Sequence, residues 1–363
     1  MRLPHDLVEA PLFLFQEPSQ LIQALGDRAS AELVAEIERL TELGLPPLVS
    51  QEALATMIGV NTGLIWSFIN RPNKHYRTFE IRKGRGVRNI TAPRVAIKVV
   101  QKWLSIHIGR SYQAPSHVYG FVSGRSHVDA ALNHVGASWA FSADIRAFFE
   151  TTPQNAVVEA LRYIGYNEVS ANLVAKLCCF RGFLAQGAPT SPVLSNICFR
   201  TLDEAVVKLA QKFQCRVTRY ADDIVFSGSG EFNPELRNEL EQLMENTPWN
   251  LAPEKMSIQP IKGRIKIHGL LISQENVRLT RGYRNQLRAY AHVLVKKGAS
   301  ADGYSKLMGH IEYARFVNRK TNSPTGYSSD VDQALLQQKE KTRKRMAKEN
   351  NSIFNRLRQL LGV

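Results

Sequence analysis

The stretch that decides the fold is Arg216-Val-Thr-Arg-Tyr-Ala-Asp-Asp-Ile-Val-Phe226. Two runs rich in β-branched and aromatic residues flank a pair of adjacent aspartates, and this pattern predicts a strand, a tight turn and a second strand. Neighbouring carboxylates at the tip of a hairpin repel each other, and such a pair is tolerated where a divalent cation neutralises it. A solvated Asp-Asp turn explains this segment alone equally well.

A third carboxylate favours the metal interpretation. Phe141-Ser-Ala-Asp-Ile-Arg places Asp144 at the end of a mostly apolar strand predicted over Trp139–Asp144. Two hard cations about 4 Å apart need bridging carboxylates from separate segments, and such a pair of ions serves phosphoryl transfer. We expect Asp144 and Asp222 to bridge the two ions and Asp223 to support them. Oxygen ligands favour Mg²⁺, with Mn²⁺ as the alternative.

The charge of the chain points to a polyanionic partner. Its 363 residues include 47 Lys and Arg against 32 Asp and Glu, a formal net charge of +15. Such a surplus favours nucleic acid or an anionic membrane surface, although a merely basic soluble protein has to be weighed against both. No apolar run approaches the ~18 residues needed to span a bilayer, and acidic residues near the N-terminus argue against a signal peptide. The four cysteines show no CxxC spacing, so we expect reduced thiols, a cytoplasmic location and no membrane partner.

The rest of the chain mixes helical and strand patterns. Apolar spacing predicts helices within 1–45 and a helical pair over 50–69, with Ser50 as an N-cap, a turn at Gly59 and a face formed by Ala53, Leu54, Ile58 and Leu64. A β-hairpin is predicted over 79–90 and a helix after Pro93. A helix at 231–248, strands at 265–281, basic helices at 282–320 and a Lys/Arg-rich tail at 331–363 complete the pattern. The helical pair resembles a helix-turn-helix, but it has no basic or amide-rich face for reading bases, so we interpret it as a packed pair.

Four segments together carry a family resemblance. Tyr220-Ala-Asp-Asp223 resembles the YxDD motif of reverse transcriptases, and Asp144 with Phe148-Phe149 resembles their first catalytic motif. Gln186-Gly-Ala-Pro-Thr-Ser-Pro-Val-Leu-Ser-Asn196 is similar to the bacterial QGxPxSPxLxN motif, and Lys255 matches the lysine of the next one. The order and spacing agree over roughly residues 76–320. The resemblance implies an α+β right-hand polymerase fold, with an antiparallel palm sheet flanked by helices. The implied divisions are a helical extension at 1–75, fingers and palm at 76–262, the end of the palm with a basic helical thumb at 263–325, and a basic tail at 326–363.

The resemblance also implies roles for single residues. The backbone carbonyl of Ile145 would join the three aspartates as a metal ligand, and Phe149 would lie under the sugar and exclude a 2′-hydroxyl. Lys255 would act on the leaving pyrophosphate. The remaining implied contacts to the incoming dNTP come from Lys83, Arg88, Arg125, Gln186 and Gly187, with Arg85 a weaker candidate on the same hairpin as Arg88.

Among bacterial reverse transcriptases, the chain most resembles those of retrons. Asp129-Ala-Ala-Leu-Asn-His134 is similar to the retron NAxxH element, Ile267-His-Gly269 lies where Val-Thr-Gly is usual, and Lys306-Leu-Met-Gly-His-Ile-Glu-Tyr313 matches the thumb pattern. Ala130 and His268 depart from the usual residues. The contacts to template RNA implied by the resemblance and by basic charge are His134, His268, Arg281, Arg284, Arg288, Lys296 and Lys297.

A retron enzyme implies a specific biology. It would prime from the 2′-hydroxyl of a guanosine in a structured noncoding RNA, copy that RNA into branched multicopy single-stranded DNA, and act in anti-phage defence. Its partners would be that RNA, the DNA product, dNTPs and a separate effector protein, and oligomers are possible. Three alternatives stay open: a bacterial reverse transcriptase unrelated to retrons (group II-like or otherwise defence-associated), a catalytically idle RNA-binding scaffold, and a DNA-binding regulator built on residues 1–75.

Overall fold

The computed structural model describes residues 9–83, 86–260, 264–297, 301–322 and 340. The chain forms two compact units. Unit 1 comprises Met1–Ala130 and Ala140–Ile258, and unit 2 comprises Ala131–Trp139 and Gln259–Val363. The predicted tail at 331–363 lies outside the described residues, apart from residue 340. Within the described part of the chain, no helix combines the length and apolar character needed to cross a bilayer.

Unit 1 begins with helices, as the spacing of apolar residues predicted. They are α2 (Pro18–Leu25), α3 (Ala31–Glu42), α4 (Gln51–Ile58) and α5 (Thr62–Asn70), with 3-10 turns at Gly26–Arg28 (η1) and Pro72–Lys74 (η2). The side chain of Ser50 accepts a hydrogen bond from the backbone N–H of Ala53, and Gly59 ends α4 in the left-handed conformation at φ +69°. Both details of the predicted helical pair are therefore confirmed.

The buried face of the helical pair differs in part from the predicted one. Ala53 and Leu54 are buried as expected, but Ile58 and Leu64 are only half-buried. Their neighbours Met57, Ile65 and Phe68 fill the core instead. Helix α5 packs against α9 (Glu168–Cys178), and α4 packs against α2. These contacts support the interpretation of a packed pair.

The helices of unit 1 are followed by a long antiparallel hairpin and a further helix. Strands β1 (Tyr76–Lys83) and β2 (Gly86–Pro93) pair in register from Tyr76 with Pro93 to Lys83 with Gly86. Helix α6 (Val95–Ser111) begins two residues after Pro93, whose ring ends the strand. In α6, Val100, Trp103 and Leu104 are buried whereas Val95 is exposed.

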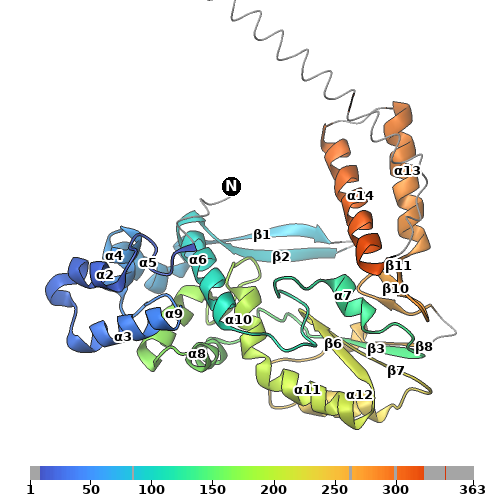
Figure 1. The fold of residues 1–363 in the computed structure, drawn as a ribbon, viewed down its shortest axis with the longest axis horizontal. Helices are drawn as coiled ribbons and strands as arrows, with labels where there is room; N and C mark the ends of the chain where they lie inside the picture. Colours follow the sequence, from blue (N-terminus) through green and yellow to red (C-terminus); the bar gives the residue numbers. More distant parts are fainter. Residues whose placement is uncertain (1–8, 84–85, 261–263, 298–300, 323–339, 341–363) are drawn as a thin grey trace, which may run out of the picture. The chain divides into compact units, whose positions relative to one another are not determined.

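A four-stranded sheet forms the centre of unit 1, in the order β6-β7-β3-β8 (Figure 1). Its strands are β3 (Trp139–Asp144), β6 (Arg216–Tyr220), β7 (Asp223–Gly228) and β8 (Ser257–Pro260). The elements around it are α7 (His127–Leu132), α8 (Gln154–Tyr163), α9, the short strands β4 (Cys179–Phe180) and β5 (Phe183–Leu184), α10 (Ser191–Cys198), α11 (Arg200–Lys212), α12 (Glu235–Met244) and the turn η3 (Pro253–Lys255). Burial of Phe141 and Ala143 in β3 and of Ile224 through Phe226 in β7 anchors the two central strands in the core.

Helix α12 is shorter than the predicted 231–248. It starts after Pro234, where the side chain of Asn233 accepts a hydrogen bond from the backbone N–H of Glu235. It ends before Asn246, which has φ +62°. The proline before the helix and the left-handed residue after it therefore limit the helix to Glu235–Met244.

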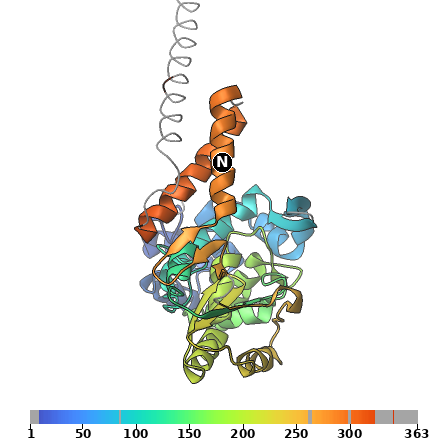
Figure 2. The same ribbon diagram turned by 90° about the vertical axis from the view of Figure 1, so that its right-hand side faces the viewer.

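Unit 2 combines a small sheet with a helical hairpin. Strands β9 (Lys266–Ile267), β10 (Leu270–Ile272) and β11 (Val277–Leu279) are ordered β11-β10-β9. Helices α13 (Arg281–Lys297) and α14 (Ala301–Thr321) lie side by side (Figures 1 and 2), and α14 also contacts β11. The buried residues between these elements include Leu287, Leu307, Ile311 and Ala314. The predicted strands at 265–281 and basic helices at 282–320 are confirmed, and so is the α+β class.

Candidate active site

The two adjacent aspartates stand at the turn between β6 and β7, as the sequence predicted. Tyr220 pairs with Asp223 across the hairpin, so Ala221 and Asp222 form the turn itself. Ala221 has φ +58°, a left-handed conformation that costs a non-glycine residue about 1 kcal/mol. The turn is therefore held in place by its surroundings rather than by its own backbone preference.

Backbone hydrogen bonds bring the third aspartate to this turn. The N–H of Ile145 donates to the carbonyl of Asp222 at 2.7 Å, so the end of β3 is fixed beside the β6–β7 turn. On its other side, the carbonyl of Asp144 accepts from the N–H of Ala252 at 2.8 Å. Asp144 and Asp222 are thereby placed as neighbours by main-chain contacts.

The side chain of Asp144 has a cationic partner. The Nζ atom of Lys255, at the end of η3, lies 2.5 Å from Oδ1 of Asp144. The lysine side chain is half exposed and the aspartate side chain is 21% exposed, so this ion pair lies at the surface of the site. Lys255 is thus gathered with the carboxylates, as the family resemblance implied.

The electrostatics around Asp222 favour a bound cation. Burial raises the pKa of Asp222, and the negative charges of Asp144 and Asp223 raise it further, while a backbone hydrogen bond and Lys255 oppose the shift. A carboxylate in this setting is unfavourable when ionised without a counter-charge. Hard carboxylate oxygens suit Mg²⁺ or Mn²⁺, so the donor set fits the expected ions.

The aspartates do not form a closed ligand set in this conformation. Among the residues that the structure describes, no group of three or more His, Cys, Asp and Glu side chains has the arrangement of a metal site. Asp144 is instead paired with Lys255. A metal ion that binds Asp144 therefore has to compete with the lysine.

The residues expected near the nucleotide sugar divide into a buried and an accessible ring. Phe148 is buried and packs edge-on against Phe199, whereas Phe149 is half-buried and lies 5.7 Å from the ring of Phe121. One of the two phenylalanines thus serves the core, as expected. Phe149 keeps the accessible position that contact with a sugar requires.

Gly187 meets the β1–β2 hairpin directly. Its N–H donates to the carbonyl of Thr91 at 2.9 Å, and a Cβ atom at this position would lie 2.7 Å from the Cβ of Ala92. The absence of a side chain is therefore required for contact with β2. Gln186, next to it, is half-buried, and its contact with a nucleotide stays a prediction.

The predicted cations have different surroundings. Arg88, on β2, is half-buried, and both its positive charge and the negative charge of Asp222 act on the carboxyl of Glu150. Partial burial raises the pKa of Glu150, Arg88 opposes this shift and Asp222 adds to it. Arg88 and Asp222 therefore both lie close enough to Glu150 for their charges to act on it. The Lys83 side chain and all of Arg85 lie outside the described residues.

The guanidinium of Arg125 is engaged with its own loop. It donates to the backbone carbonyls of Ala114, Pro115 and Val118. These bonds brace the loop that precedes Gly120 and occupy the guanidinium that was predicted to contact the dNTP. The sequence did not reveal this role, because loop carbonyls leave no pattern in side-chain type.

The residues predicted to contact RNA belong to unit 2. His134 is fully buried, so its ring presents no surface to RNA in this conformation. His268 is half-buried with φ +49°. On α13, Arg281 and Arg288 are exposed and Arg284 is half-buried, while the side chains of Lys296 and Lys297 lie outside the described residues.

Sequence reasoning missed a buried ion pair beneath the turn. Arg219 and Asp203 are both fully buried, and their side chains form a two-pronged pair with distances of 2.7 and 2.6 Å. The available signal was a charged residue inside a predicted strand, one position before Tyr220. Its partner is 16 residues away on a helix, so the pairing is not readable from local spacing.

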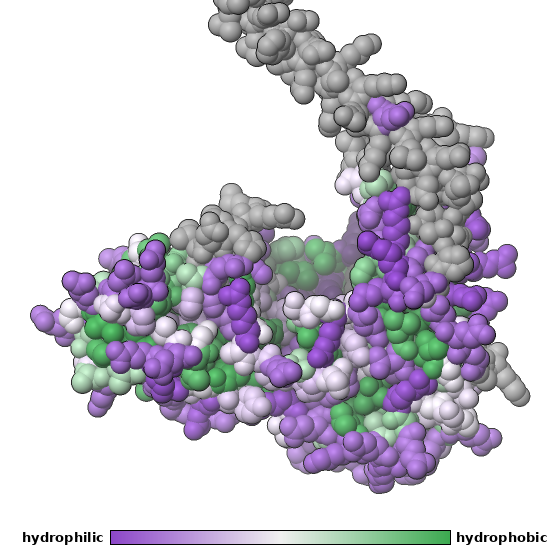
Figure 3. Space-filling view, viewed as in Figure 1, coloured by the Kyte–Doolittle hydropathy of each residue, from purple (hydrophilic) through white to green (hydrophobic). Residues whose placement is uncertain are grey.

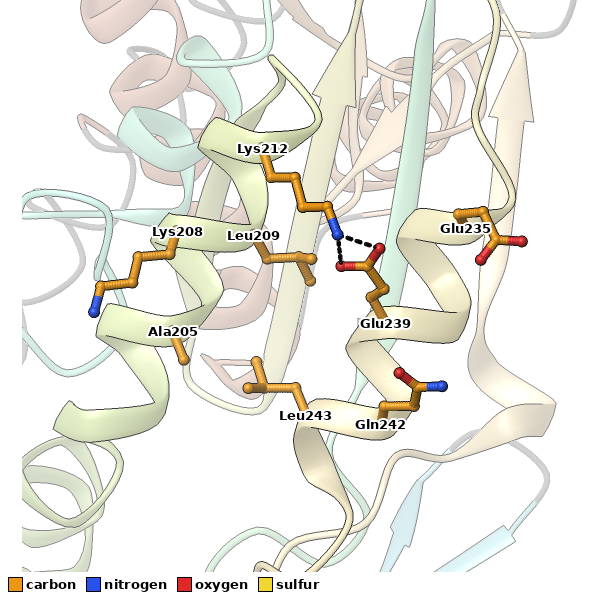
Figure 4. A pocket seen from close by; sticks show the side chains of 8 residues that line it. All are labelled: Ala205, Lys208, Leu209, Lys212, Glu235, Glu239, Gln242 and Leu243. Atoms are coloured by element: carbon orange, nitrogen blue, oxygen red, sulfur yellow. Dashed lines mark hydrogen bonds and ion pairs between the residues drawn. The ribbon is translucent and has the colours of Figure 1, made fainter.

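A shallow groove elsewhere in unit 1 is unrelated to these residues. It lies between α11 and α12 and is crossed by the ion pair of Lys212 with Glu239 (Figure 4). Hydrophilic residues cover the lower edge of the molecule, where these two helices lie (Figures 1 and 3). The groove contains none of the predicted site residues, so it is not the candidate active site.

A hairpin carrying two aspartates beside a strand that ends in a third is the arrangement of a nucleotidyl-transferring polymerase. Residues 81–277 match the family model described as reverse transcriptase (RNA-dependent DNA polymerase). The chain belongs to this family, and its activity is RNA-directed DNA polymerisation. A reverse transcriptase domain implies dependence on divalent metal ions in general.

The most similar curated relatives include enzymes of retrons. Retron Ec86 reverse transcriptase of Escherichia coli is 28% identical over 258 residues, covering 70% of this chain and 81% of the relative. Retron Mx65 reverse transcriptase of Myxococcus xanthus is 28% identical over 316 residues, covering 80% and 74%. The resemblance to retron reverse transcriptases is confirmed.

Solved structures with similar folds include a telomerase and a viral enzyme. Apo telomerase from Candida tropicalis, truncated from its C-terminal domain, is 14% identical with a TM-score of 0.41 and covers 61% of each chain. The foamy viral protease-reverse transcriptase in complex with RNA/DNA hybrid is 15% identical with a TM-score of 0.40. That match covers 72% of this chain and 32% of the viral one.

Proposed function

We propose that this chain is the polymerase of a retron and copies a structured noncoding RNA into branched, multicopy single-stranded DNA. The observation that supports the catalytic part is the backbone hydrogen bond from Ile145 to Asp222. This bond fixes Asp144 beside the turn formed by Ala221 and Asp222, which we call the catalytic turn. The similarity to the Ec86 and Mx65 enzymes supports the retron part. Priming from the 2′-hydroxyl of a guanosine belongs to the same proposal.

Asp144, Asp222 and Asp223, with the carbonyl of Ile145, would hold two Mg²⁺ or Mn²⁺ ions. When bound, such ions activate the attacking hydroxyl and neutralise charge on the pyrophosphate that leaves. Lys255 is positioned to donate a proton or positive charge to that leaving group. Its contact with Asp144 supports this role, because it places the ammonium group at the proposed metal site.

The other residues of unit 1 would orient the substrate. Phe149 would present its half-buried ring to the sugar, and Arg88, whose charge acts on the same carboxyl of Glu150 as that of Asp222, would bind the triphosphate. Lys83, Gln186 and Gly187 are further contacts of this kind in the proposal. Arg125 is the weakest of them, since its guanidinium already binds three backbone carbonyls.

Unit 2 would serve as the RNA-binding thumb. The exposed arginines on α13 suit a phosphate backbone, and RNA helices are recognised mainly by shape and backbone. We include fingers and palm within 76–262 and a thumb within 263–325 in the proposal. A separate effector protein, a role in anti-phage defence and a cytoplasmic location belong to it as well.

The test is to purify the protein from its native locus and sequence the nucleic acid that copurifies with it. A short RNA joined to DNA by a 2′–5′ branch is expected. Unbranched cDNA would instead indicate a reverse transcriptase unrelated to retrons. The double variant Asp222→Asn and Asp223→Asn should lose DNA synthesis and keep RNA binding. DNA synthesis that persists in the double variant would refute the two-metal assignment and not the retron assignment.

A further inference from the structure

Arg219 lies directly beneath the catalytic turn with its guanidinium removed from water. The residue is the penultimate one of β6, and its side chain is 1% exposed. The guanidinium lies 4.9 Å from the ring centre of Phe199 and 6.0 Å from that of Phe148. A buried cation is costly unless its hydrogen bonds are satisfied, so its partners identify its role.

All three guanidinium nitrogens have partners. Nε and Nη2 donate to the two carboxylate oxygens of Asp203 on α11, at 2.7 and 2.6 Å. Nη1 donates to Oδ1 of Asn196 on α10 and to the backbone carbonyl of Ala221, each at 3.0 Å. Ala221 is the left-handed residue that immediately precedes Asp222. One end of the guanidinium is thus anchored in the helices, and the other end holds the catalytic turn.

Asp203 is kept ionised to anchor this arginine. Burial by itself would raise the pKa of Asp203, but the charge and hydrogen bonds of Arg219, with help from His117, hold the pKa below its usual value. Nε2 of His117 lies 3.2 Å from Oδ1 of Asp203. The pair is therefore a fixed charge pair rather than a shared proton.

The same network holds the loop that covers the turn. Asn196 accepts from Arg219 and donates through Nδ2 to the carbonyl of Gly120 at 2.9 Å. The N–H of Tyr119 donates to the carbonyl of Arg219 at 2.8 Å. The residue after Gly120 is Phe121, whose ring contacts Phe149. The catalytic turn and the ring expected under the sugar are thus tied to one guanidinium.

We propose that Arg219, anchored by Asp203, is a positioning residue that holds the carbonyl of Ala221 so that Asp222 and Asp223 are presented to the metal ions. The inference rests on the proposed metal site at Asp144, Asp222 and Asp223. It assigns the buried pair to the geometry of the turn, beyond any contribution to the stability of unit 1.

Stability alone does not account for such a pair. Replacing a buried ion pair by apolar residues of similar volume is often neutral or stabilising, whereas removing one partner leaves a buried charge unpaired. Lysine cannot reproduce the fork, because its single ammonium cannot reach both oxygens of Asp203 and the carbonyl of Ala221 at once. These two facts separate a positioning role from a structural one.

The experiment compares three variants of the full chain with wild type. Arg219→Lys keeps the charge and loses the fork, and the double variant Arg219→Met with Asp203→Leu removes both charges together. Lys212→Met is the matched control, because it breaks an exposed ion pair on the same helix as Asp203. The measurements are Tm without metal, Mn²⁺ binding to the free protein by electron paramagnetic resonance, and kcat and KM for dNTP on a short primed RNA template.

Arg219→Lys and the double variant should bind Mn²⁺ about 10-fold more weakly, in the range found when partners that orient metal ligands are removed, and kcat should fall by a similar factor. KM for dNTP should change by less than about twofold, and Lys212→Met should match wild type. Wild-type Mn²⁺ binding and kcat in either folded Arg219 variant would overturn the proposal. Asp222→Asn distinguishes failure of the positioning role from failure of the proposed metal site. If this variant binds Mn²⁺ as tightly as wild type, the proposed metal site itself is wrong.

Discussion

Replacing Gly120 by alanine tests how closely the loop must approach the catalytic turn. Gly120 is buried, and a Cβ atom there would lie 2.0 Å from the backbone nitrogen of Ala221 and 2.8 Å from the carbonyl carbon of Tyr220. Ordinary contacts begin near 3.4 Å, so the shorter gap has to widen from 2.0 Å to at least that value. Both atoms are main chain, so no side chain can rotate away to make room.

The displacement sets the size of the expected effect. Overpacking of this kind typically costs about 1–3 kcal/mol of folding free energy. A reacting group misplaced by about 1 Å can lose about 10²-fold in rate. We therefore expect Gly120→Ala to lower kcat by roughly 100-fold and to lower Tm by several degrees, because the turn that carries Asp222 has to move.

The assay is single-nucleotide extension of a primed RNA template at saturating dNTP and Mg²⁺, together with thermal unfolding. Gly109→Ala is the matched control, since it lies inside α6 and its added Cβ would meet only Cγ2 of Val193 at 3.9 Å. This control should keep its kcat and gain about 0.5–1 kcal/mol, because alanine is the better helix former. A Gly120→Ala protein with the kcat of wild type would refute the argument from close approach.

Three further outcomes are expected. Asp222→Asn should abolish extension. It should also raise the Tm of the metal-free protein by about 2 °C, the shift that ~1 kcal/mol produces, because it removes the repulsion from Asp144 and Asp223. An unchanged or lower Tm would contradict this expectation. In wild type, burial and the charges of Asp144 and Asp223 raise the pKa of Asp222, so this carboxylate keeps its proton to a higher pH than an ordinary aspartate. With Mg²⁺ below saturation, kcat/KM should therefore begin to fall, as the pH is lowered, at a pH above the usual aspartate pKa. A flat pH profile in that region would contradict the prediction. Phe149→Ala should increase the incorporation of ribonucleotides relative to deoxyribonucleotides by about 10- to 100-fold. Competition assays with both kinds of nucleotide measure this ratio. Phe148→Leu, a change in the core, is the control and should leave the ratio unchanged.

Local patterns predicted the parts of the structure that local forces determine. The β6–β7 hairpin and β3 were predicted because alternating β-branched residues and turn residues act over a few positions. The buried residues Met57, Ile65 and Phe68 were missed because a short helix allows more than one apolar face. Only the packing of α5 on α9 and of α4 on α2 selects between these faces.

The residues of the candidate site also divide into those that local sequence predicted and those that only the folded structure revealed. The three aspartates and Lys255 were predicted to act together, and backbone bonds and an ion pair gather Asp144, Asp222 and Lys255. Arg219 was not predicted, because a charged residue in a strand is read as exposed until its distant partner is known. The engagement of Arg125 with backbone carbonyls was equally invisible, since only the folded loop creates those acceptors.

The contact between Lys255 and Asp144 would couple two steps of the proposed mechanism. In this structure the ammonium group of Lys255 rests on Oδ1 of Asp144, so the lysine and one carboxylate oxygen engage each other. If Asp144 binds a metal ion as proposed, the ion would replace the ammonium group at this carboxylate and leave the lysine available to the pyrophosphate. On that proposal, an enzyme without its metal would keep Lys255 engaged on Asp144 and away from the leaving pyrophosphate.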